Sequence, residues 1–313
     1  NAGSWSFTSA ALTEGTHTVI VTATDNAGNV TSTTSSNIII DLTNPNVTFT
    51  PIPFTNDNTP TLTGTYSDAN GVASVTVSID GGAAQTATLN AGTWSYTVPS
   101  TLTAGTHTVV VTATDNAGNV TSTTSSNMLI DVTLPQVAIN STPNVNSATP
   151  TITGTVSDEV AGSGITSVMI SIDGGVAQAA TISGNTWQFT PAVALAEGNH
   201  SVVATALDNA GNSINSTAMN FAVDLAAPDV NITTTNIGAN QMMSGTVSPD
   251  AVSVTVTINS IVYNANITNP GNWEISPTNF QTVADNIYNA TVVATDISGN
   301  ITTVNKTITF DQT

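Results

Sequence analysis

The sequence has no cysteine, no arginine and a single lysine, Lys306. Without cysteine there can be no disulfide bonds and no thiolate metal sites, so packing and hydrogen bonds must hold the fold together. Without basic residues the 20 acidic side chains stay uncompensated, and the formal net charge is −19. So few cations cannot neutralise phosphates, which excludes nucleic acid as a partner. The same shortage excludes attraction to an anionic membrane surface.

Long hydrophobic runs are also missing. No segment approaches the roughly 20 apolar residues that a membrane helix needs, so we expect no membrane insertion. Charged residues make up only 7% of the chain, far below the quarter usual in soluble proteins. Thr, Ser, Asn, Val and Ala dominate instead, which is typical of β-strands whose exposed faces carry hydroxyls and amides. The apolar share of 39% argues against a disordered chain.

Against these absences stands a clear internal repeat. The stretch TATDNAGNVTSTTSSN occurs at 22–37 and again at 112–127, and degenerate forms follow at 205–220 and 293–300. Residues 17–41 and 107–131 differ at only three positions. Such self-similarity at a fixed period indicates tandem copies of one structural module. Tryptophan recurs in the same rhythm, at Trp5, Trp94, Trp187 and Trp273.

The repeat divides the chain into modules. Residues 42–131, 132–224 and 225–313 each form one complete copy. Residues 1–41 match only the second half of a copy, so we expect the C-terminal half of a truncated module. Half a module leaves its apolar face uncovered, and we expect this segment to be poorly supported unless something pairs with it.

Within each module, period-two alternation of apolar and polar residues predicts short β-strands, and no helical periodicity competes with it. Asp80-Gly81 and Asp173-Gly174 are dipeptides typical of tight type I′ hairpins. The predicted fold is therefore all-β, with tandem immunoglobulin-like β-sandwich domains arranged as a linear rod. In the 42–131 module we expect strands at 46–50, 61–66, 73–79, 83–89, 93–98, 106–114 and 120–130.

Histidine occupies one recurring place. His17, His107 and His200 stand at the start of the penultimate strand, and Tyr288 takes this place in the last module. Immunoglobulin-like folds often have a corner tyrosine here that hydrogen-bonds to the preceding turn. Because tyrosine substitutes in one copy, we favour this structural role over a catalytic or metal-binding one.

Aspartate recurs in three places per module. One set heads the loop before the last strand, one closes each module, and one lies between the second and third strands. In a seven-stranded sandwich these positions meet at one pole. We therefore expect three groups: Asp41 with Asp68 and Asp115, Asp131 with Asp158 and Asp208, and Asp224 with Asp250 and Asp296. Asp25 heads the same loop within residues 1–41, and Asp311 closes the last module.

These groups predict calcium sites. Carboxylates that cluster without a basic neighbour need a cation to remain ionised. Ligands that are all oxygen, carried on loops, suit Ca²⁺, and Asn70, Glu159 and loop carbonyls could complete its coordination. The alternative is that Asp-Asn-Ala-Gly-Asn is simply a good turn sequence. An EF-hand is rejected because no bidentate glutamate follows. In the last module SPDAV and DISGN replace SDANG and DNAGN, so its ligand set is weaker.

The VTATDNAGN turn, the IDxTxP junction and the period of about ninety residues resemble bacterial immunoglobulin-like repeats. Such repeats form the stalks of giant adhesins exported by type I secretion. The resemblance implies a location outside the cell or on the bacterial surface and neighbouring repeats as partners. It also implies rigidity given by calcium ions at the domain junctions, so that the stalk projects a distal binding tip towards host cells.

Two other function classes remain. The modules could themselves bind host glycan or protein, a reading that an exposed tryptophan on a flat face would strengthen. Host-cell glycans could also be reached through the tip of the parent protein. An enzyme is disfavoured, because the histidines share one structural place and no Ser-His-Asp or paired-carboxylate setting offers a general acid or base.

Overall fold

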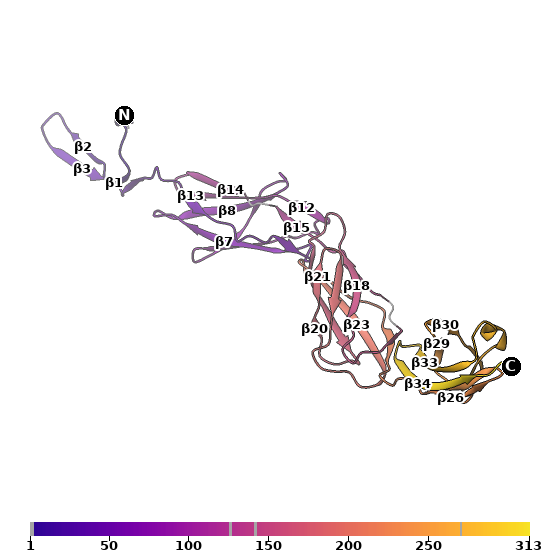
Figure 1. Cartoon of the computed structure of the whole chain (residues 1–313). Helices are drawn as coiled ribbons and strands as arrows, with labels where there is room; N and C mark the ends of the chain where they lie inside the picture. The colour runs from indigo at the N-terminus through magenta and orange to yellow at the C-terminus, as the bar shows by residue number, and fades with distance from the viewer. Residues whose placement is uncertain (1–2, 125–126, 141–142, 270) are drawn as a thin grey trace. The chain divides into compact units, whose positions relative to one another are not determined.

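The computed structural model describes residues 3–124, 127–140, 143–269 and 271–313. These residues confirm the predicted all-β class (Figure 1), and their one helical turn is the 3₁₀ segment η1, Pro277–Phe280. The chain divides into two compact units, which are described separately. The first holds residues 1–134 with the loops 158–164 and 208–212, and the second holds 135–157, 165–207 and 213–313.

In the first unit, the 42–131 module is a sandwich of two sheets. Side chains from both sheets form one core around Trp94, which includes Leu62, Val75 and Val111. One sheet has the order β10 (Thr88–Asn90), β11 (Thr93–Thr97), β7 (Thr61–Ser67), β5 (Asn46–Val47). The other comprises β14 (Val120–Thr124), β13 (Val109–Asp115), β8 (Val72–Ile79) and β9 (Gln85–Thr86), with β12 (Gly105–His107), β15 (Met128–Ile130) and β6 (Phe54–Thr55) as a separate ladder.

The second unit repeats this plan twice. In the first copy the core lies around Trp187 and Phe221. One of its sheets has the order β16 (Gln136–Ile139), β18 (Ile152–Ser157), β22 (Thr186–Phe189), β21 (Thr181–Ser183). The other has the order β17 (Asn144–Val145), β25 (Met219–Val223), β23 (Gly198–Asp208), β19 (Ile165–Ile172), β20 (Gln178–Ala179), with β24 (Ser213–Asn215) paired to β23.

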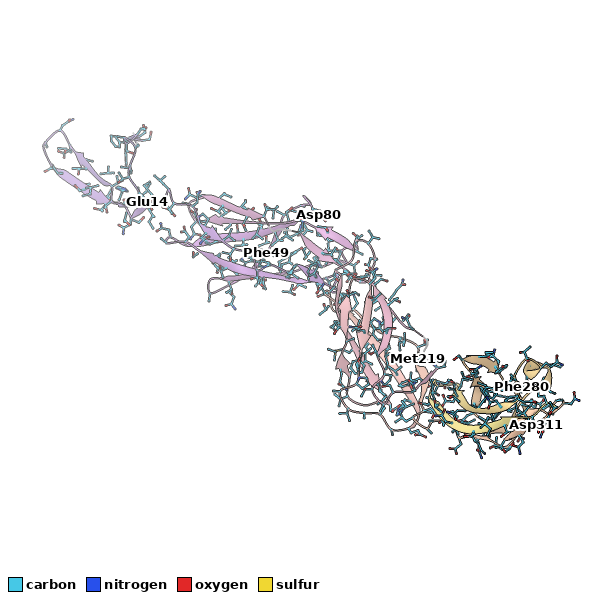
Figure 2. All side chains as sticks on the ribbon, in the orientation of Figure 1. Glu14, Phe49, Asp80, Met219, Phe280 and Asp311 are labelled. Atoms are coloured by element: carbon cyan, nitrogen blue, oxygen red, sulfur yellow. The ribbon has the colours of Figure 1, made fainter. Side chains whose placement is uncertain are left out.

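The last copy has its core around Trp273 and Phe280. Phe280 (Figure 2) packs against Tyr263 at a tilt and against Phe310 edge to face, with ring centroids 5.1 and 5.4 Å away. One sheet has the order β26 (Val230–Ile232), β28 (Met243–Val247), β32 (Asn272–Ile275), β31 (Asn266–Asn269). The other has the order β27 (Asn236–Ile237), β34 (Ile301–Phe310), β33 (Asn286–Asp296), β29 (Ala251–Ile258), β30 (Ile261–Asn264).

Two short antiparallel strand pairs are present in the described residues of the N-terminal segment, 3–41. β1 (Gly15–His17) pairs with β4 (Ile38–Ile40), and β2 (Ile20–Thr24) pairs with β3 (Val30–Thr34). Trp5 is 67% exposed here, whereas Trp94 at the same place in the next module is 1% exposed. The expected uncovered apolar face is therefore observed in the described part of this segment.

The strand boundaries differ from the prediction at several points. The predicted strand 106–114 is interrupted at Thr108, because its N–H donates to the Asp80 carboxylate instead of to the ladder. The predicted strand 83–89 divides because β9 pairs with one sheet and β10 with the other. The predicted strand 120–130 becomes β14 and β15, and its residues 125–126 lie outside the described residues. The short β6 was not predicted, and it pairs in parallel with β15.

Candidate metal centres

The structure contains three groups of carboxylates. In each group, one oxygen atom from each side chain lies within 4.8 Å of those from the other two. Two of these groups have the predicted members. In the second group Glu159 takes the place predicted for Asp208. Asp25 belongs to no such group among the described residues. The first acidic cluster is Asp41, Asp68 and Asp115, the second is Asp131, Asp158 and Glu159, and the third is Asp224, Asp250 and Asp296.

The sandwich topology explains how the first acidic cluster forms. Asp68 follows β7 directly, in the loop that leads to β8. Asp115 ends β13 and pairs with Val72, the first residue of β8, where a register shift interrupts the ladder. Both carboxylates therefore lie at the same end of the sandwich. Asp41 reaches that end because the module begins immediately after it.

The turn that begins at Asp115 is held by its own carboxylate. Oδ1 accepts the N–H groups of Ala117, Gly118 and Asn119 at 2.7–2.9 Å, and Oδ2 accepts the side-chain amide of Asn119 at 2.7 Å. Burial acts to raise the pKa of Asp115, but the hydrogen bonds from Asn119, Ala117 and Gly118 together outweigh it and the pKa is lowered. The turn role considered from sequence is thus present, together with membership of the acidic cluster. Equivalent bonds occur at Asp25, Asp208 and Asp296.

The asparagine that ends each turn also contacts the closing aspartate of the preceding module. Asn119 Nδ2 donates to the main-chain oxygen of Asp41 at 3.1 Å. Asn212 makes the same bond to Asp131 at 2.9 Å. We call these residues and their equivalent in the last module the turn asparagines. Sequence reasoning missed them, although the final letter of DNAGN is asparagine in every copy. The third turn asparagine is Asn300, which bonds the main-chain oxygen of Asp224 at 2.9 Å.

Among the clustered carboxylates, Asp41 has the surroundings that best fit a cation. The residue is 7% exposed, and its Oδ1 accepts the N–H of Thr43 at 3.1 Å. Its Oδ2 is buried and has no hydrogen-bond partner. A hollow of about 230 Å³ lies beside it, lined in part by Asn70 and Asn116. Leaving a charged oxygen buried without a partner is costly, so a cation at this point would satisfy the site.

The second acidic cluster shows the same need in a different form. Asp158 Oδ1 is buried without a partner. Burial near the cluster raises the pKa of Glu159, and the adjacent Asp158 carboxylate raises it further. Burial also acts to raise the pKa of Asp131, but hydrogen bonds from Ser163 outweigh it and the pKa is lowered. The donor set is entirely oxygen, so these residues fit a hard cation such as Ca²⁺.

The corner role predicted for the histidines is confirmed. Nε2 of His17, His107 and His200 lies 2.8 Å from the carbonyl oxygen four residues earlier. Tyr288 donates its hydroxyl to Ala284 in the same way, at 3.2 Å. A further contact was not predicted: Nδ1 of His107 lies 2.6 Å from Asp80 Oδ2. Asp80 therefore contacts the corner histidine in addition to forming the hairpin turn.

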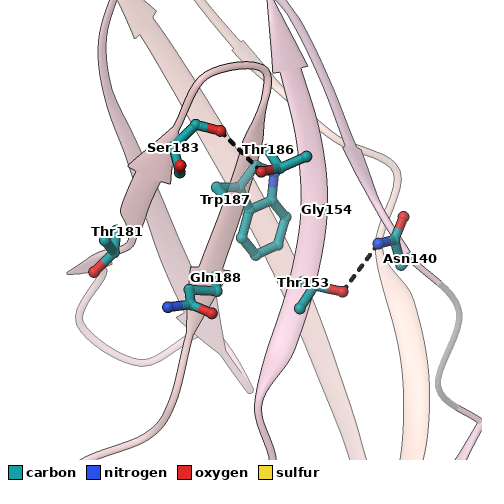
Figure 3. Close-up of a pocket in the computed structure, with 8 residues that line it drawn as sticks. All are labelled: Asn140, Thr153, Gly154, Thr181, Ser183, Thr186, Trp187 and Gln188. Atoms are coloured by element: carbon teal, nitrogen blue, oxygen red, sulfur yellow. Dashed lines mark hydrogen bonds between the residues drawn. The ribbon is translucent and has the colours of Figure 1, made fainter.

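A hollow of about 460 Å³ lies on the β16–β18–β22–β21 sheet (Figure 3). Thr186 and Asn140 on its wall are held by hydrogen bonds to Ser183 and Thr153. Trp187 lies against Gly154 here, but the indole is buried and forms part of the core. Trp94 and Trp273 are buried in the same way. The tryptophans of these three modules therefore offer no exposed aromatic platform.

The chain belongs to the bacterial Ig-like domain family, since the sequence profile of that family matches residues 1–42, 53–132, 139–225 and 231–312. A second profile, bacterial Ig-like domain group 3, matches residues 185–269. A comparison with curated protein sequences gives no significant match. In the described residues, no helix is both long enough and apolar enough to cross a membrane.

Several solved structures are similar to this chain. One is a tetra-tandem repeat in the extending region of a large adhesion protein, with 26% identity over 96% of this chain and 83% of that chain, and a TM-score of 0.33. Another is a structure from work on a 1.5-MDa bacterial ice-binding adhesin, with 23% identity over 86% of this chain and 98% of the chain in that structure, and a TM-score of 0.36. A third is the set of fibronectin(III)-like modules of Clostridium thermocellum CbhA, with 17% identity over 56% and 95%, and a TM-score of 0.39.

Proposed function

We propose that this chain is a calcium-rigidified stalk segment of a giant bacterial surface adhesin. The observation that carries the proposal is the buried, unpartnered Oδ2 of Asp41 within a cluster of three carboxylates. Lys306 is the one Lys or Arg in the sequence, and it bonds the main-chain oxygen of Ile232. A cation from solution is therefore needed to neutralise the clusters.

Calcium would act on the connection between neighbouring repeats. Asp41 closes one repeat, while Asp68 and Asp115 belong to loops of the next. An ion bound by all three joins the connecting segment to the following module. Only three residues separate Asp41 from Pro45, and proline fixes its own φ, so the connection has little slack. In this proposal the array is a rod with calcium and a jointed chain without it.

The ligand assignment covers three centres. Asp41, Asp68 and Asp115 hold one ion, and Asp224, Asp250 and Asp296 form the corresponding centre in the last module. In the second centre Asp131 and Asp158 are joined by Glu159. Asp208 Oδ2 accepts a hydrogen bond from the side-chain amide of Asn212, and the same amide donates to the main-chain oxygen of Asp131. Asp208 therefore helps to position Asp131 without being a ligand itself. Asp25 heads an equivalent turn within residues 1–41.

The proposed setting is outside the cell. Modules with boundaries at 42–131, 132–224 and 225–313 would follow one another as spacers, and a distal tip of the parent protein would contact the host. In calcium-poor cytosol the clustered carboxylates repel one another and keep the chain competent for export by type I secretion. Calcium outside the cell would then drive folding. The alternative, that a module itself grips host glycan, has less support because the module tryptophans are buried.

Calorimetric titration of the full chain with calcium chloride tests the central assignment. We expect Asp41→Asn and Asp68→Asn each to remove one binding event from the isotherm. Asp57→Asn makes the same change of charge at an exposed turn outside the clusters, and it should leave the isotherm unchanged. Absence of calcium binding, or an equal effect of all three substitutions, would refute the proposal.

A further inference from the structure

We propose that Ser298 makes the third acidic cluster a joint that does not need calcium. Its hydroxyl donates to the aspartate oxygen that, at the first acidic cluster, would bind the proposed ion. The inference rests on the proposed function and refines its ligand assignment: the first and second acidic clusters bind calcium tightly, and the third does not.

The three closing aspartates differ at one oxygen. In each of them Oδ1 accepts the main-chain N–H two residues later, at 3.1–3.2 Å. The other oxygen, Oδ2, has no partner in Asp41. In Asp131 it accepts the N–H of Ser163 at 2.7 Å. In Asp224 it accepts the hydroxyl of Ser298 at 2.9 Å, so both oxygens of this carboxylate are satisfied by the protein alone.

The sequence explains this difference. The turn that reads DNAGN at 115–119 and 208–212 reads DISGN at 296–300. Ser298 therefore stands where the other turns have Ala117 and Ala210, whose methyl groups cannot donate a hydrogen bond. Its main-chain N–H still bonds Asp296 Oδ1 at 2.9 Å, so the turn itself is kept. The side chain at this one position gives Asp224 Oδ2 a donor that the turns at 115–119 and 208–212 cannot offer.

The second acidic cluster is an intermediate case. Asp131 is satisfied by Ser163, but Asp158 retains a buried oxygen with no partner, and Glu159 adds a third carboxylate. A cation would therefore still be needed to satisfy the buried Asp158 oxygen in this cluster. In the third, no side-chain oxygen remains both buried and unpartnered among the described residues, and Asp250 is exposed. An ion entering there would have to displace the Ser298 hydroxyl from Asp224.

The test isolates the third acidic cluster within the full chain. Asp41→Asn and Asp158→Asn together disable the first and second clusters, and calcium chloride titration then reports on the third. We expect no tight binding in this background, and the appearance of one site when Ser298→Ala is added. The reverse exchange, Ala117→Ser in the otherwise native chain, should weaken the first site about tenfold or more, as one hydrogen bond to a charged group would. Ser95→Ala removes a hydroxyl far from any cluster and serves as the control.

The outcomes separate the two proposals. Calcium binding that persists unchanged through Asp41→Asn and Asp158→Asn refutes the proposed function itself. Loss of binding at those two clusters, with a third site equally tight whether or not Ser298 is present, overturns only the present inference. Failure of Ser298→Ala to create a site also overturns it. Thermal unfolding in chelator gives a second readout, in which Ser298→Ala should lower the melting temperature while Ser95→Ala does not.

Discussion

The side-chain amide of Asn119 donates to the main-chain oxygen of Asp41, 78 residues earlier in the chain, at a distance of 3.1 Å. The same amide bonds Oδ2 of Asp115, so it joins the turn of one module to the closing residue of the repeat before it. At the next junction the N–H of Asp131 donates to the carbonyl oxygen of Thr55, and the carbonyl oxygen of Asp131 accepts the side-chain amide of Asn212. This closing aspartate is thus hydrogen-bonded at both its main-chain N–H and its main-chain carbonyl oxygen.

Replacing a turn asparagine should destabilise the chain with or without calcium. Asn119→Ala leaves the Asp41 carbonyl without its side-chain donor, a loss of about 1–3 kcal/mol if the site stays dry. Urea denaturation measures this as a lower midpoint at unchanged slope. Asn199→Ala, on an exposed position of β23, is the matched control and should shift the midpoint little. Equal shifts for both variants would show that the contact contributes nothing.

The His107–Asp80 pair should make stability depend on pH. Burial acts to lower the pKa of His107, but the Thr103 carbonyl and the Asp80 carboxylate outweigh it, and the pKa is raised. The hydrogen bond from His107 in turn lowers the pKa of Asp80. The histidine contribution is therefore complete below its unfolded pKa of about 6.5 and is lost as pH rises through the folded value. The aspartate contribution is present above about pH 4 and is lost as pH falls.

Thermal unfolding between about pH 5 and pH 8 checks this expectation, since histidine titrates in that range. The native chain should lose stability towards the upper end, and His107→Gln should flatten that loss. His17→Gln is the control, because the hydrogen bond of His17 is to the Thr13 carbonyl and not to a carboxylate. A pH profile that is identical in the native chain and in His107→Gln would contradict the assignment.

Gly154→Ala should destabilise the 132–224 module. A Cβ at this position would overlap the Trp187 ring and the Ala138 carbonyl oxygen, and neither can move away without disturbing the core. Overpacking of this kind costs about 1–3 kcal/mol. Gly238→Ala is the control, because its nearest atom would lie at an ordinary 3.7 Å. Chemical denaturation that ranks Gly238→Ala as the more harmful change would be the contrary result.

Glu159→Gln should have opposite effects in chelator and in calcium. Without calcium, removing one of three crowded carboxylates relieves repulsion and raises the melting temperature. With calcium, the same change removes a ligand, so the increase in melting temperature on adding calcium becomes smaller. Glu197→Gln changes an exposed glutamate of the same module and controls for net charge. A variant with an unchanged response to calcium would exclude Glu159 as a ligand.

Much of the fold could be predicted because it depends on local patterns. Alternation located the main strands, and the recurring Trp94, Trp187 and Trp273 are buried in the cores of the three modules. The loops that bring Asp68 and Asp115 together follow from sandwich topology alone, so the first and third acidic clusters could be predicted from spacing. The break at Thr108 could not, because it depends on a hydrogen bond to Asp80, which is distant in sequence.

The finer features of the centres also lay beyond the sequence. Glu159 displaces Asp208 from the second acidic cluster because neighbouring residues of one loop can reach the same point, and spacing does not show which does so. The role of Asn119 depends on where an amide points, and that of Ser298 on a hydroxyl 74 residues from its acceptor. Both residues stand at repeated positions, but only the three-dimensional structure identifies their partners.

Small-angle scattering of the full chain, first in calcium and then in excess chelator, tests most directly whether calcium rigidifies the joints. We predict the profile of a long stiff particle in calcium, and a shorter or more flexible one in chelator. The variant that combines Asp41→Asn with Asp158→Asn should show the flexible profile even in calcium, whereas Asp57→Asn should behave like the native chain. Profiles that are the same in calcium and in chelator would contradict the account and would leave the repeated aspartates as turn residues.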